Sequence, residues 1–486
     1  MYHSKNRLST MKKYKIAKIA IAFTSLLIAT SCTKFDDDIN VSPNKPLVAY
    51  NSDLFTYAMR YVSNTSEATQ GALYVQQLAE TQYTDASRYT NVAFDWSVFY
   101  ANPLMNLQYI ISQPINPLTE ATEGSANNQK AVARILRAYF YWHLTDRWGD
   151  IPYAQALQGS ANFAPVYTSQ KDVYYDLMKE LKEAAAQIDG GKGVKTDFLY
   201  NKNMSKWKKL ANTMRALMAL RISKVDQTKA QTEFNDAITS GVFASNADNF
   251  VYPHLEETAN QNFWFSALSK DACAPSATLV DYLISTNDPR LTTFANKNKL
   301  TPAVYAGMPY GLMNDEASQI PSKNISTVGD KLRQKTSSTQ LITYAQLLFA
   351  KAEAAKAGII SGGDAEAQAN YNLAIENSLI QWNGDNTGLT TFLADPAVAY
   401  DSNNAIKLIA YQRWVHLYMN GYEAWAEWRR TGYPQLTAAS GTAGIPTRQA
   451  YPSSEFTLNR QNYDKAKEAL GGKDDLYGRV WWNKQN

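Results

Sequence analysis

The stretch NQKAVARILRAYFYWHLTDRWGDIP, residues 128–152, decides the fold class. Its large apolar residues recur at three- and four-residue spacing, which places them on one face of an α-helix. That face is formed by Val132, Ile135, Leu136, Tyr139 and His143. Asp146, Gly149 and Pro152 then provide the residue types at which helices end. The pattern predicts one long helix that is buried along one side.

Further segments of the chain have the same periodicity, and alternation typical of strands is scarce. Helices are predicted over 171–188, 205–224, 227–239, 340–357, 364–382 and 404–431. In the last segment one stripe is formed by Leu408, Tyr411, Val415, Tyr418 and Tyr422. Gly432 and Pro434 end that helix. The sequence therefore predicts a mainly α protein.

A weak internal repeat indicates how these helices pair. The second helix of a tetratricopeptide (TPR) hairpin carries a small residue, a large apolar residue four positions on, and a small residue three further. Two triplets fit fully, Ala230–Phe234–Ala237 and Ala367–Tyr371–Ala374. Leu177–Leu181–Ala184 fits loosely, and Gly421–Trp425–Trp428 fits at its first two positions. Because the triplets are spaced far more widely than the 34 residues of regular TPR arrays, we expect four TPR-like hairpins separated by long insertions.

This spacing divides the chain into parts. Hairpins are expected over about 129–240 and 340–431, with a loop-rich insertion over 241–339 and an irregular C-terminal region over 433–486. A structureless loop as long as the insertion usually has a function in a compact protein. We therefore expect the insertion to form a binding face on a helical scaffold.

Composition excludes several classes of protein. The chain has 486 residues, of which 45% are hydrophobic and 19% charged, as is ordinary for a globular protein. Its 2 Cys exclude a disulfide framework and a zinc site built on several thiolates. The net charge of +4 depends on six basic residues within 1–31, and without them it becomes −2. This balance argues against a nucleic-acid partner.

The N-terminus has the pattern of an export signal. A lysine-rich stretch precedes the apolar run 19–28, which is too short for the roughly 20 residues that span a bilayer. Ala29, Thr30 and Ser31 then lead to Cys32, and this resembles a bacterial lipobox. The resemblance implies that residues 1–31 are removed and that Cys32 is acylated, with Met1 or Met11 as the start. The alternative is a plain secretory signal with an incidental cysteine.

Residues 32–50 are expected to form a lipidated acidic tether, with three successive aspartates at 36–38. In some Gram-negative bacteria such acidic residues accompany export to the outer face of the cell, and this resemblance implies the same location here. The alternative is a solvated spacer without any signal. Three adjacent aspartates on a flexible tether converge poorly on one Ca²⁺, so no calcium site is predicted there.

Five longer passages resemble the SusD/RagB family of outer-membrane nutrient-binding lipoproteins, in its SusD-like branch. They are DINVSPNKP at 38–46, ARILRAYFYWHLTDRWGDIP at 133–152, SATLVDYLISTNDPRL at 276–291, YAGMPYG at 305–311 and QRWVHLYMNGYEAWAEWRRTGYP at 412–434. The resemblance extends over essentially the whole chain after the signal. It implies four TPR-like hairpins, an oligosaccharide ligand, an outer-membrane location through the lipid anchor, and a TonB-dependent, SusC-like transporter as partner.

Aromatic residues in the irregular segments suit capture of a sugar. A flat ring covers the apolar face of a sugar, and neighbouring amides, acids and cations bind its hydroxyls. The expected site combines the aromatic cluster 83–100 with the loops at 250–310. The stacking residues predicted are Tyr89, Trp96, Trp264, Tyr305 and Tyr310, and the polar ones are Asp85, Arg88 and Asn262. Core packing is the alternative role for each of these rings.

No enzyme motif of the metalloprotease, esterase, P-loop or dinucleotide-binding type is present in the sequence. Glu423 and Glu427 are expected to form a solvated or arginine-paired helix face with Arg430. We therefore expect a binding protein that is not an enzyme and uses no cofactor, with calcium conceivable only as a structural ion. Three other functions remain open: a peptide-binding RagB-like protein, a glycoside hydrolase and a TPR scaffold that binds only proteins.

Overall fold

The computed structural model of the chain describes residues 50–91 and 94–483. The predicted signal segment, Cys32 and the tether up to residue 49 lie outside these residues. Within them, helices dominate and strands are short and few, which confirms the predicted mainly α class.

Four helix hairpins form the scaffold, as the repeat predicts. The hairpins are α7 (Ala126–Trp148) with α8 (Gln170–Gln187), α9 (Met204–Arg221) with α10 (Gln227–Thr239), α15 (Tyr344–Lys356) with α16 (Gly363–Asn383), and α18 (Ala405–His416) with α19 (Gly421–Thr431). Each predicted triplet lies on the second helix of its hairpin. Phe234 and Tyr371, the large members of the two full triplets, are completely buried.

Polar caps define where these helices begin. The side chains of Ser125, Ser169, Asn203 and Asp226 each accept a hydrogen bond from a backbone N–H in the first turn of α7, α8, α9 and α10. At their C-terminal ends, two of the helices stop at the glycines that the sequence predicted as helix ends. Helix α7 ends before Gly149, and α19 ends before Gly432 in the left-handed conformation.

The segment 404–431 differs from its prediction, because it forms two helices instead of one. The chain turns between His416 and Gly421, where Met419 has a left-handed φ of 66°. An apolar stripe reports which side chains are buried, and it continues across such a turn when both helices pack on the same core. The periodicity of 404–431 therefore concealed the turn inside the fourth hairpin, although the triplet at Gly421 and Trp425 indicated its second helix.

The remaining elements are short. The other helices are α2 (Asn51–Met59), α3 (Thr69–Tyr74), α4 (Ser97–Phe99), α5 (Met105–Ser112), α6 (Pro117–Glu123), α11 (Phe263–Ala267), α12 (Ala277–Ser285), α13 (Leu291–Phe294), α14 (Asn314–Ser318), α17 (Leu389–Ala394), α20 (Ser453–Leu458) and α21 (Arg460–Ala469). In the described residues the strands form three antiparallel pairs. These are β1 (Leu78–Glu80) with β5 (Cys273–Pro275), β2 (Ile151–Pro152) with β3 (Tyr167–Thr168), and β4 (Phe250–Tyr252) with β6 (Thr339–Ile342).

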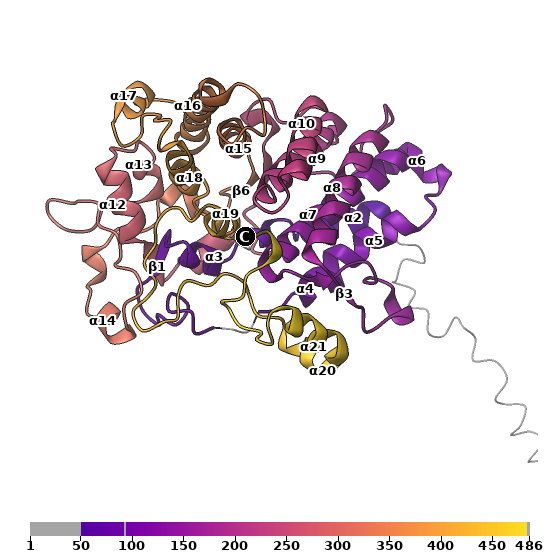
Figure 1. The fold of residues 1–486 in the computed structure, drawn as a ribbon, viewed down its shortest axis with the longest axis horizontal. Helices are drawn as coiled ribbons and strands as arrows, with labels where there is room; N and C mark the ends of the chain where they lie inside the picture. Colours follow the sequence, from indigo (N-terminus) through magenta and orange to yellow (C-terminus); the bar gives the residue numbers. More distant parts are fainter. Residues whose placement is uncertain (1–49, 92–93, 484–486) are drawn as a thin grey trace, which may run out of the picture. The chain divides into compact units, whose positions relative to one another are not determined.

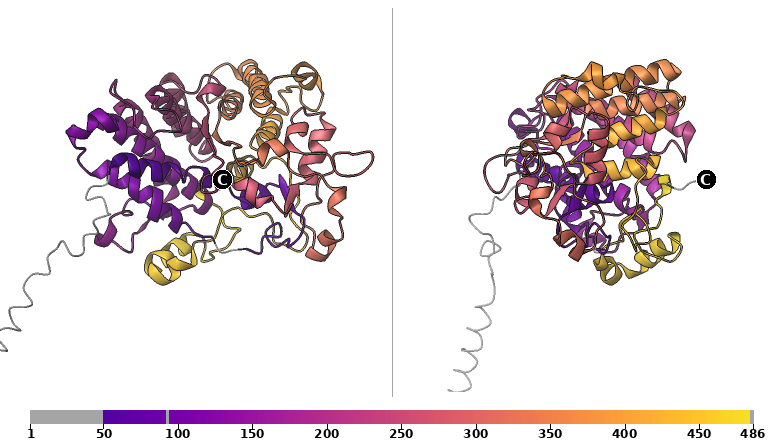
Figure 2. Two further views of the ribbon diagram at one scale, coloured as in Figure 1. Left: turned by 180° about the vertical axis from the view of Figure 1, so that it is seen from behind. Right: turned by 90° about the vertical axis from the view of Figure 1, so that its left-hand side faces the viewer.

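The C-terminal helices and α14 lie on a different side of the fold from the scaffold hairpins. In Figure 1 the hairpins α9–α10 and α15–α16 lie in the upper part of the view, whereas α14, α20 and α21 lie in the lower part. Both views in Figure 2 keep this division, with the orange helices of the second half above and the yellow C-terminal helices below. The insertion is divided between the two sides, because α12 and α13 lie at the height of the scaffold helices in Figure 1 and the segment between them bonds to α16.

A buried ionic network joins all four hairpins. Arg221 of α9 contacts Asp146 of α7 and both Glu423 and Glu427 of α19, with 2.9 Å between its Nη2 and Glu427 Oε1. The network continues from Glu427 to Arg413 of α18 and Arg430 of α19, and from these arginines to Glu353 of α15. The expected pairing of Glu427 with Arg430 is confirmed, but this face is buried instead of solvated.

Replacing Glu427 by Gln should destabilise the fold strongly. The change leaves three buried arginines without a shared carboxylate, and breaking a buried ion pair in this way costs about 3–5 kcal/mol. Urea denaturation measures the loss. Glu183→Gln is the matched control, because Glu183 pairs with Arg134 while nearly half of its side chain is exposed, and it should cost less than about 1 kcal/mol. Equal losses in the two variants would contradict the role of the network.

Acid should weaken the same network. Burial alone would raise the pKa values of Glu427 and Glu353, but arginines hold both below the usual range. Such carboxylates contribute stability that is present above the unfolded pKa of about 4.3 and is lost as pH falls through the lower native values. Glu423, whose pKa is raised by burial, acts with the opposite sign as pH rises.

We therefore expect the free energy of unfolding to decrease below about pH 4.3, and the decrease to be smaller in Glu427→Gln. Urea denaturation at several pH values between neutrality and pH 3 gives both curves. A wild-type curve that is flat over this range, or one that is parallel to that of the variant, would show that the network does not control acid stability.

Candidate functional site

A surface cleft of about 530 Å³ lies between three segments that are distant in the sequence. The segments are the chain from the end of α3 through β1 to Arg88, the loop that enters α14, and the loop that follows α19, with Thr278 of α12 beside them. Its lining includes Gln76, Arg88, Tyr310, Met313, Glu316 and Ser440. We call it the Arg88 cleft. It brings Arg88 together with Tyr310, as the sequence predicted for the 83–100 cluster and the 250–310 loops.

Arg88 ties two walls of this cleft together. Its Nη1 donates to the carbonyl of Gly311 and its Nη2 donates to the carbonyl of Ser440, both at 2.9 Å. Two of the five N–H donors of a guanidinium are used in this way. Arg88 is half-buried, so it combines a structural role with a position on the cleft wall.

Tyr310 forms the floor beside Arg88, and Tyr89 packs against it from within the core. Tyr310 is half-buried and donates from Oη to the carbonyl of Leu73 at 2.6 Å. Tyr89 lies beneath it with only 4% exposure, and the two Oη atoms are 3.4 Å apart. Burial raises the pKa of both hydroxyls, so both remain neutral. Tyr310 thus reaches the cleft, whereas the prediction that Tyr89 stacks on a ligand is contradicted by its burial.

Tyr83 is the most exposed aromatic residue beside the cleft. It is 73% exposed, and its backbone N–H donates to Asn314 Oδ1 at 2.6 Å, next to Met313 and Glu316 of the lining. The sequence placed Tyr83 in the aromatic cluster 83–100 but gave no reason to prefer it. Asp85, predicted as a polar contact, is exposed two residues further on.

The backbone around the cleft is strained at three positions. Gln76, Tyr83 and Tyr89 have φ values of 54°, 54° and 63°, in the left-handed region that residues with a Cβ rarely adopt. Strain of this kind persists only where the surrounding structure enforces it, and it clusters at functional sites. The strained segment 76–89 borders the cleft along one side.

The structure buries the two predicted tryptophans. Trp96 is 4% exposed and packs edge-to-face on Trp148, with 5.5 Å between the ring centroids. Trp264 is 2% exposed. The prediction that these rings are exposed for stacking is therefore wrong. The physical reason is that aromatic clusters pack favourably with one another, so a run of rings in a loop can become core.

Asn262 and Tyr305 also lie away from the Arg88 cleft. Asn262 is 2% exposed; its Oδ1 accepts from the N–H of Trp264 at 2.7 Å and caps α11. This is a structural role instead of the predicted ligand contact. Tyr305 is half-buried, with Lys297 Nζ 5.7 Å from its ring centre. Asn262 and Trp264 line a separate internal cavity.

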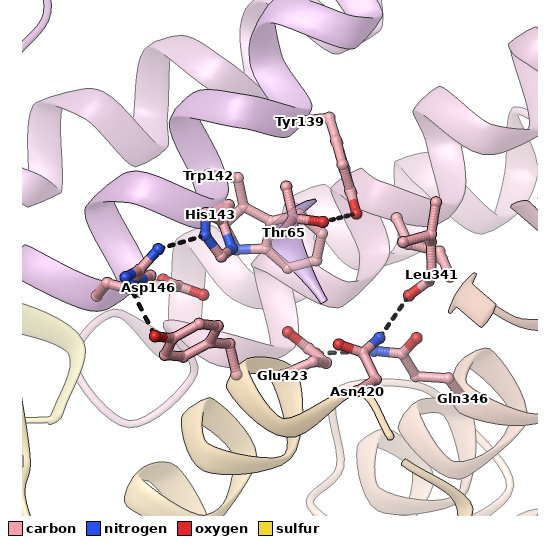
Figure 3. A pocket seen from close by; sticks show the side chains of 12 residues that line it. Thr65, Tyr139, Trp142, His143, Asp146, Leu341, Gln346, Asn420 and Glu423 are labelled. Carbon is pink, nitrogen blue, oxygen red and sulfur yellow. Dashed lines mark hydrogen bonds between the residues drawn. The ribbon is translucent and has the colours of Figure 1, made fainter. Parts of the chain in front are cut away.

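A polar cluster inside the scaffold has residue types that could be mistaken for catalytic ones. Figure 3 shows His143, Asp146 and Glu423 around a cavity of about 40 Å³, which has room only for water. Each has a protein partner: Arg147 with His143, Arg221 with Asp146, and both Arg221 and Gln346 with Glu423. Burial and nearby Arg147 hold the pKa of His143 well below its usual range. The cluster belongs to the scaffold.

Over 50–91 and 94–483, no three His, Cys, Asp or Glu side chains are grouped so that they could hold a metal ion. None of the helices in these ranges combines the length and apolar character needed to cross a bilayer.

Comparisons with known proteins point to one family. A family model described as starch-binding and associating with the outer membrane matches residues 43–452. A solved chitin-binding protein is 28% identical with a TM-score of 0.77, covering 89% of this chain and 100% of that one. A SusD homologue from Bacteroides fragilis is 25% identical with a TM-score of 0.78, covering 90% and 100%.

A chitin-binding SusD homologue from Flavobacterium johnsoniae shares the fold. It is 22% identical with a TM-score of 0.75, and the match covers 90% of this chain and 99% of that one. A search of curated proteins found no match.

Removing the Arg88 side chain should loosen both walls of the cleft. Arg88→Ala deletes two charge-assisted hydrogen bonds, each worth about 1.5–3 kcal/mol. We expect faster amide hydrogen exchange around Gly311 and around Ser440, measured by mass spectrometry, with the hairpins unchanged. Arg460→Ala is the control, because Arg460 is exposed on α21, where its ion pair is with Asp464 and its guanidinium lies over the ring of Phe456 on α20, away from both loops. If amide hydrogen exchange in both loops were unaltered, Arg88 would not be what holds them in place.

Proposed function

The chain belongs to the SusD-like family, described as starch-binding and associating with the outer membrane, and on this premise we propose that it captures oligosaccharides in the Arg88 cleft. The observation that carries the proposal is the grouping of half-buried Tyr310 with Arg88 and Gln76 in the cleft lining, with exposed Tyr83 held beside the cleft by its hydrogen bond to Asn314. Rings cover the apolar faces of sugars, while the guanidinium and the amide bind hydroxyls.

The volume of the cleft supports a chain of sugars as ligand. Ligand pockets usually measure about 300–1,000 Å³, and the cleft of about 530 Å³ opens at the surface along the strained segment 76–89. A stacked ring contributes about 1–3 kcal/mol, by analogy with bases on aromatic side chains. Two or three such contacts would bind the ligand tightly enough to capture it but weakly enough to release it, which suits delivery to another protein.

The proposal is for binding without bond cleavage or a cofactor. Glycosidases place two carboxyl groups across the bond that they break. Among the described residues that line the cleft, Glu316 is the one acid, and its Oε2 accepts from the N–H of Met313 at 2.8 Å to cap α14. This arrangement supports capture over hydrolysis.

Location and partner follow from family membership together with the N-terminal sequence. We propose that Cys32 carries the lipid anchor, that the protein faces the cell exterior, and that it passes its ligand to a SusC-like TonB-dependent transporter. The chitin-binding proteins of similar structure support a glycan ligand, and chitin and starch fragments are accordingly the first ligands to test.

Tyr83→Ala tests the cleft. If Tyr83 stacks on the ligand, the affinity for maltohexaose or chitohexaose should fall about 5- to 150-fold, because 1–3 kcal/mol is lost. The exposed side chain contributes little to stability, so the melting temperature should stay the same. Isothermal titration calorimetry measures the affinity.

Tyr109→Ala on α5 is the matched control, because Tyr109 is a similarly exposed tyrosine on the scaffold at 48% exposure. Its affinity should equal that of the wild type. Equal affinities in all three proteins would remove the stacking role of Tyr83. Binding of peptides, with none of either oligosaccharide, would replace the proposed ligand.

A further inference from the structure

The segment from Trp96 to Thr119 contains no charged residue, although 19% of the chain is charged. It runs from α4 through a turn of π-helix at Tyr100–Leu104 into α5, and then leads into α6. A long run without charge is ordinary where a segment is buried. Here much of the segment faces outward, and Leu118 near its end is 88% exposed. The lack of charge therefore needs another explanation.

One side of this helical segment is exposed and carries apolar or aromatic side chains at a spacing of three and four residues. They are Val98, Ala101, Met105 and Tyr109, joined by Tyr57 of α2. The four large side chains among them are 38–48% exposed. Tyr57 belongs to the same surface because its Oη donates to Asn102 Oδ1 at 2.9 Å. We call these five side chains the α5 face. Exposed apolar patches mark contacts with a protein or a membrane.

Charged residues flank the α5 face without entering it. The examples are Asp53 and Arg60 on α2, Asp95 just before α4, and Arg137, which reaches α5 but pairs with Glu180. A charge is costly to bring into a lipid boundary, whereas tyrosine is enriched there. A tyrosine-bearing face without charge therefore fits the surface of a bilayer.

The α5 face adjoins the point at which the predicted tether joins the fold. Helix α2 packs against α5 and begins at Asn51, and residues 33–50 separate it from Cys32. Its first turn is fixed to the scaffold, because the N–H of Ser52 donates to buried Glu123 Oε2 at 2.9 Å. An anchor on Cys32 is thus joined to a rigid part of the molecule directly beside this face.

The length of the tether makes even a weak contact effective. At about 3.3–3.6 Å per residue, the chain from Cys32 to Asn51 spans at most some 65 Å. Tethering over a short distance gives an effective concentration of about the millimolar range. In Figure 1, α2 and α5 lie on the right, whereas α14 and β1 beside the Arg88 cleft lie on the left. Contact through the α5 face therefore leaves the cleft accessible.

Shape and chemistry favour a lipid surface over a soluble ligand. A helix surface is convex, so it does not enclose a small molecule. A tyrosine at a bilayer surface places its ring at the apolar boundary and its hydroxyl among the headgroups, and helices lie in this plane with their apolar side inward. The turn of π-helix within the segment is a feature found frequently at functional sites.

We propose that the α5 face rests on the surface of the lipid bilayer in which Cys32 is anchored. This inference rests on the lipid anchor proposed for Cys32 and adds a second contact to it. The acyl chains hold the protein at the membrane, and the face determines which side of the protein turns toward the lipid. The Arg88 cleft is thereby held away from the bilayer.

The test attaches the purified chain to vesicles of known composition. The chain that begins at Cys32 is coupled through that thiol to a maleimide lipid in phosphatidylcholine vesicles. Cys273 does not compete, because it is buried and burial raises its pKa to about 12. Hydrogen peroxide then oxidises exposed methionines to sulfoxides, which mass spectrometry measures. Met105 reports on the α5 face, and Met313, 49% exposed beside the Arg88 cleft, is the internal control.

Met105 should oxidise about fivefold more slowly on vesicles than in solution if the face is in contact about four-fifths of the time. Met313 should oxidise at one rate in both. Because the face carries no charge, adding phosphatidylglycerol should change neither rate. Three results would each overturn the proposal: no slowing of Met105, equal slowing of both methionines, or slowing of Met105 only on vesicles that contain phosphatidylglycerol.

A pair of variants locates the contact. Ala101→Asp places a carboxylate on the α5 face one turn before Met105, and its Met105 should oxidise on vesicles as fast as in solution. Ala369→Asp is the matched control, because Ala369 is an exposed alanine on α16, and its Met105 should stay protected. Melting temperatures verify that both variants fold. Protection that persists equally in both variants would place the lipid contact elsewhere and would contradict the inference.

Failure of this inference is distinguishable from failure of the proposed function. The maleimide lipid replaces the natural acyl chains, so the result does not depend on acylation of Cys32 in the cell, which the mass of the protein extracted from membranes tests separately. Oligosaccharide affinity is measured on the chain free in solution, where the α5 face has no lipid to contact. Tyr109→Ala therefore remains a control for Tyr83→Ala.

Discussion

The ionic network that centres on Arg221 and Glu427 is the interaction on which the other parts of the fold depend. Removing a charge from water costs several kcal/mol per ion, so such groups are tolerated only where their geometry satisfies one another. Here that geometry requires α7, α9, α15, α18 and α19 to meet at fixed positions. Apolar packing alone would permit helices to slide, because it is not directional. The network therefore fixes how the four hairpins are arranged, and with them the bases of the loops.

The position of the Arg88 cleft follows from this arrangement. Gly421, at the start of α19, lies against Gly71 of α3, where a Cβ on Gly71 would stand 2.5 Å from the carbonyl carbon of Gly421. Trp414 of α18 donates to the carbonyl of Val75 at 3.0 Å, just after α3. The α3 segment is thereby anchored on the fourth hairpin, and its Leu73 carbonyl accepts from Tyr310. A rigid scaffold thus determines where the floor of the cleft lies.

The sequence predicted the scaffold better than the site, and the reason is physical. Helical periodicity and the triplets at Phe234 and Tyr371 report burial along one helix, so they identify hairpins without knowledge of the partner. Loops have no such period, and exposure there depends on contacts across the chain. Trp96 and Trp264 became core while Tyr83 stayed in solvent, although all three stand in similar aromatic stretches. The repeat identified Gly421 as a small residue that allows close packing. The element that packs closely against it is α3, and not α18, its partner in the hairpin.

Residues in an unfavourable backbone conformation can indicate where a site lies, which amino-acid composition cannot do. Asparagine and aspartate enter the left-handed region at little cost, so the informative cases among the described residues are the others: Gln76, Tyr83, Tyr89, Leu157, Lys202 and Met419. Three of these border the Arg88 cleft, whereas five of the eight hairpin helices begin at a side-chain cap. Natural sequences follow local preference except where function opposes it. The same reasoning that assigns the long helices to stability therefore favours the Arg88 cleft as the candidate site.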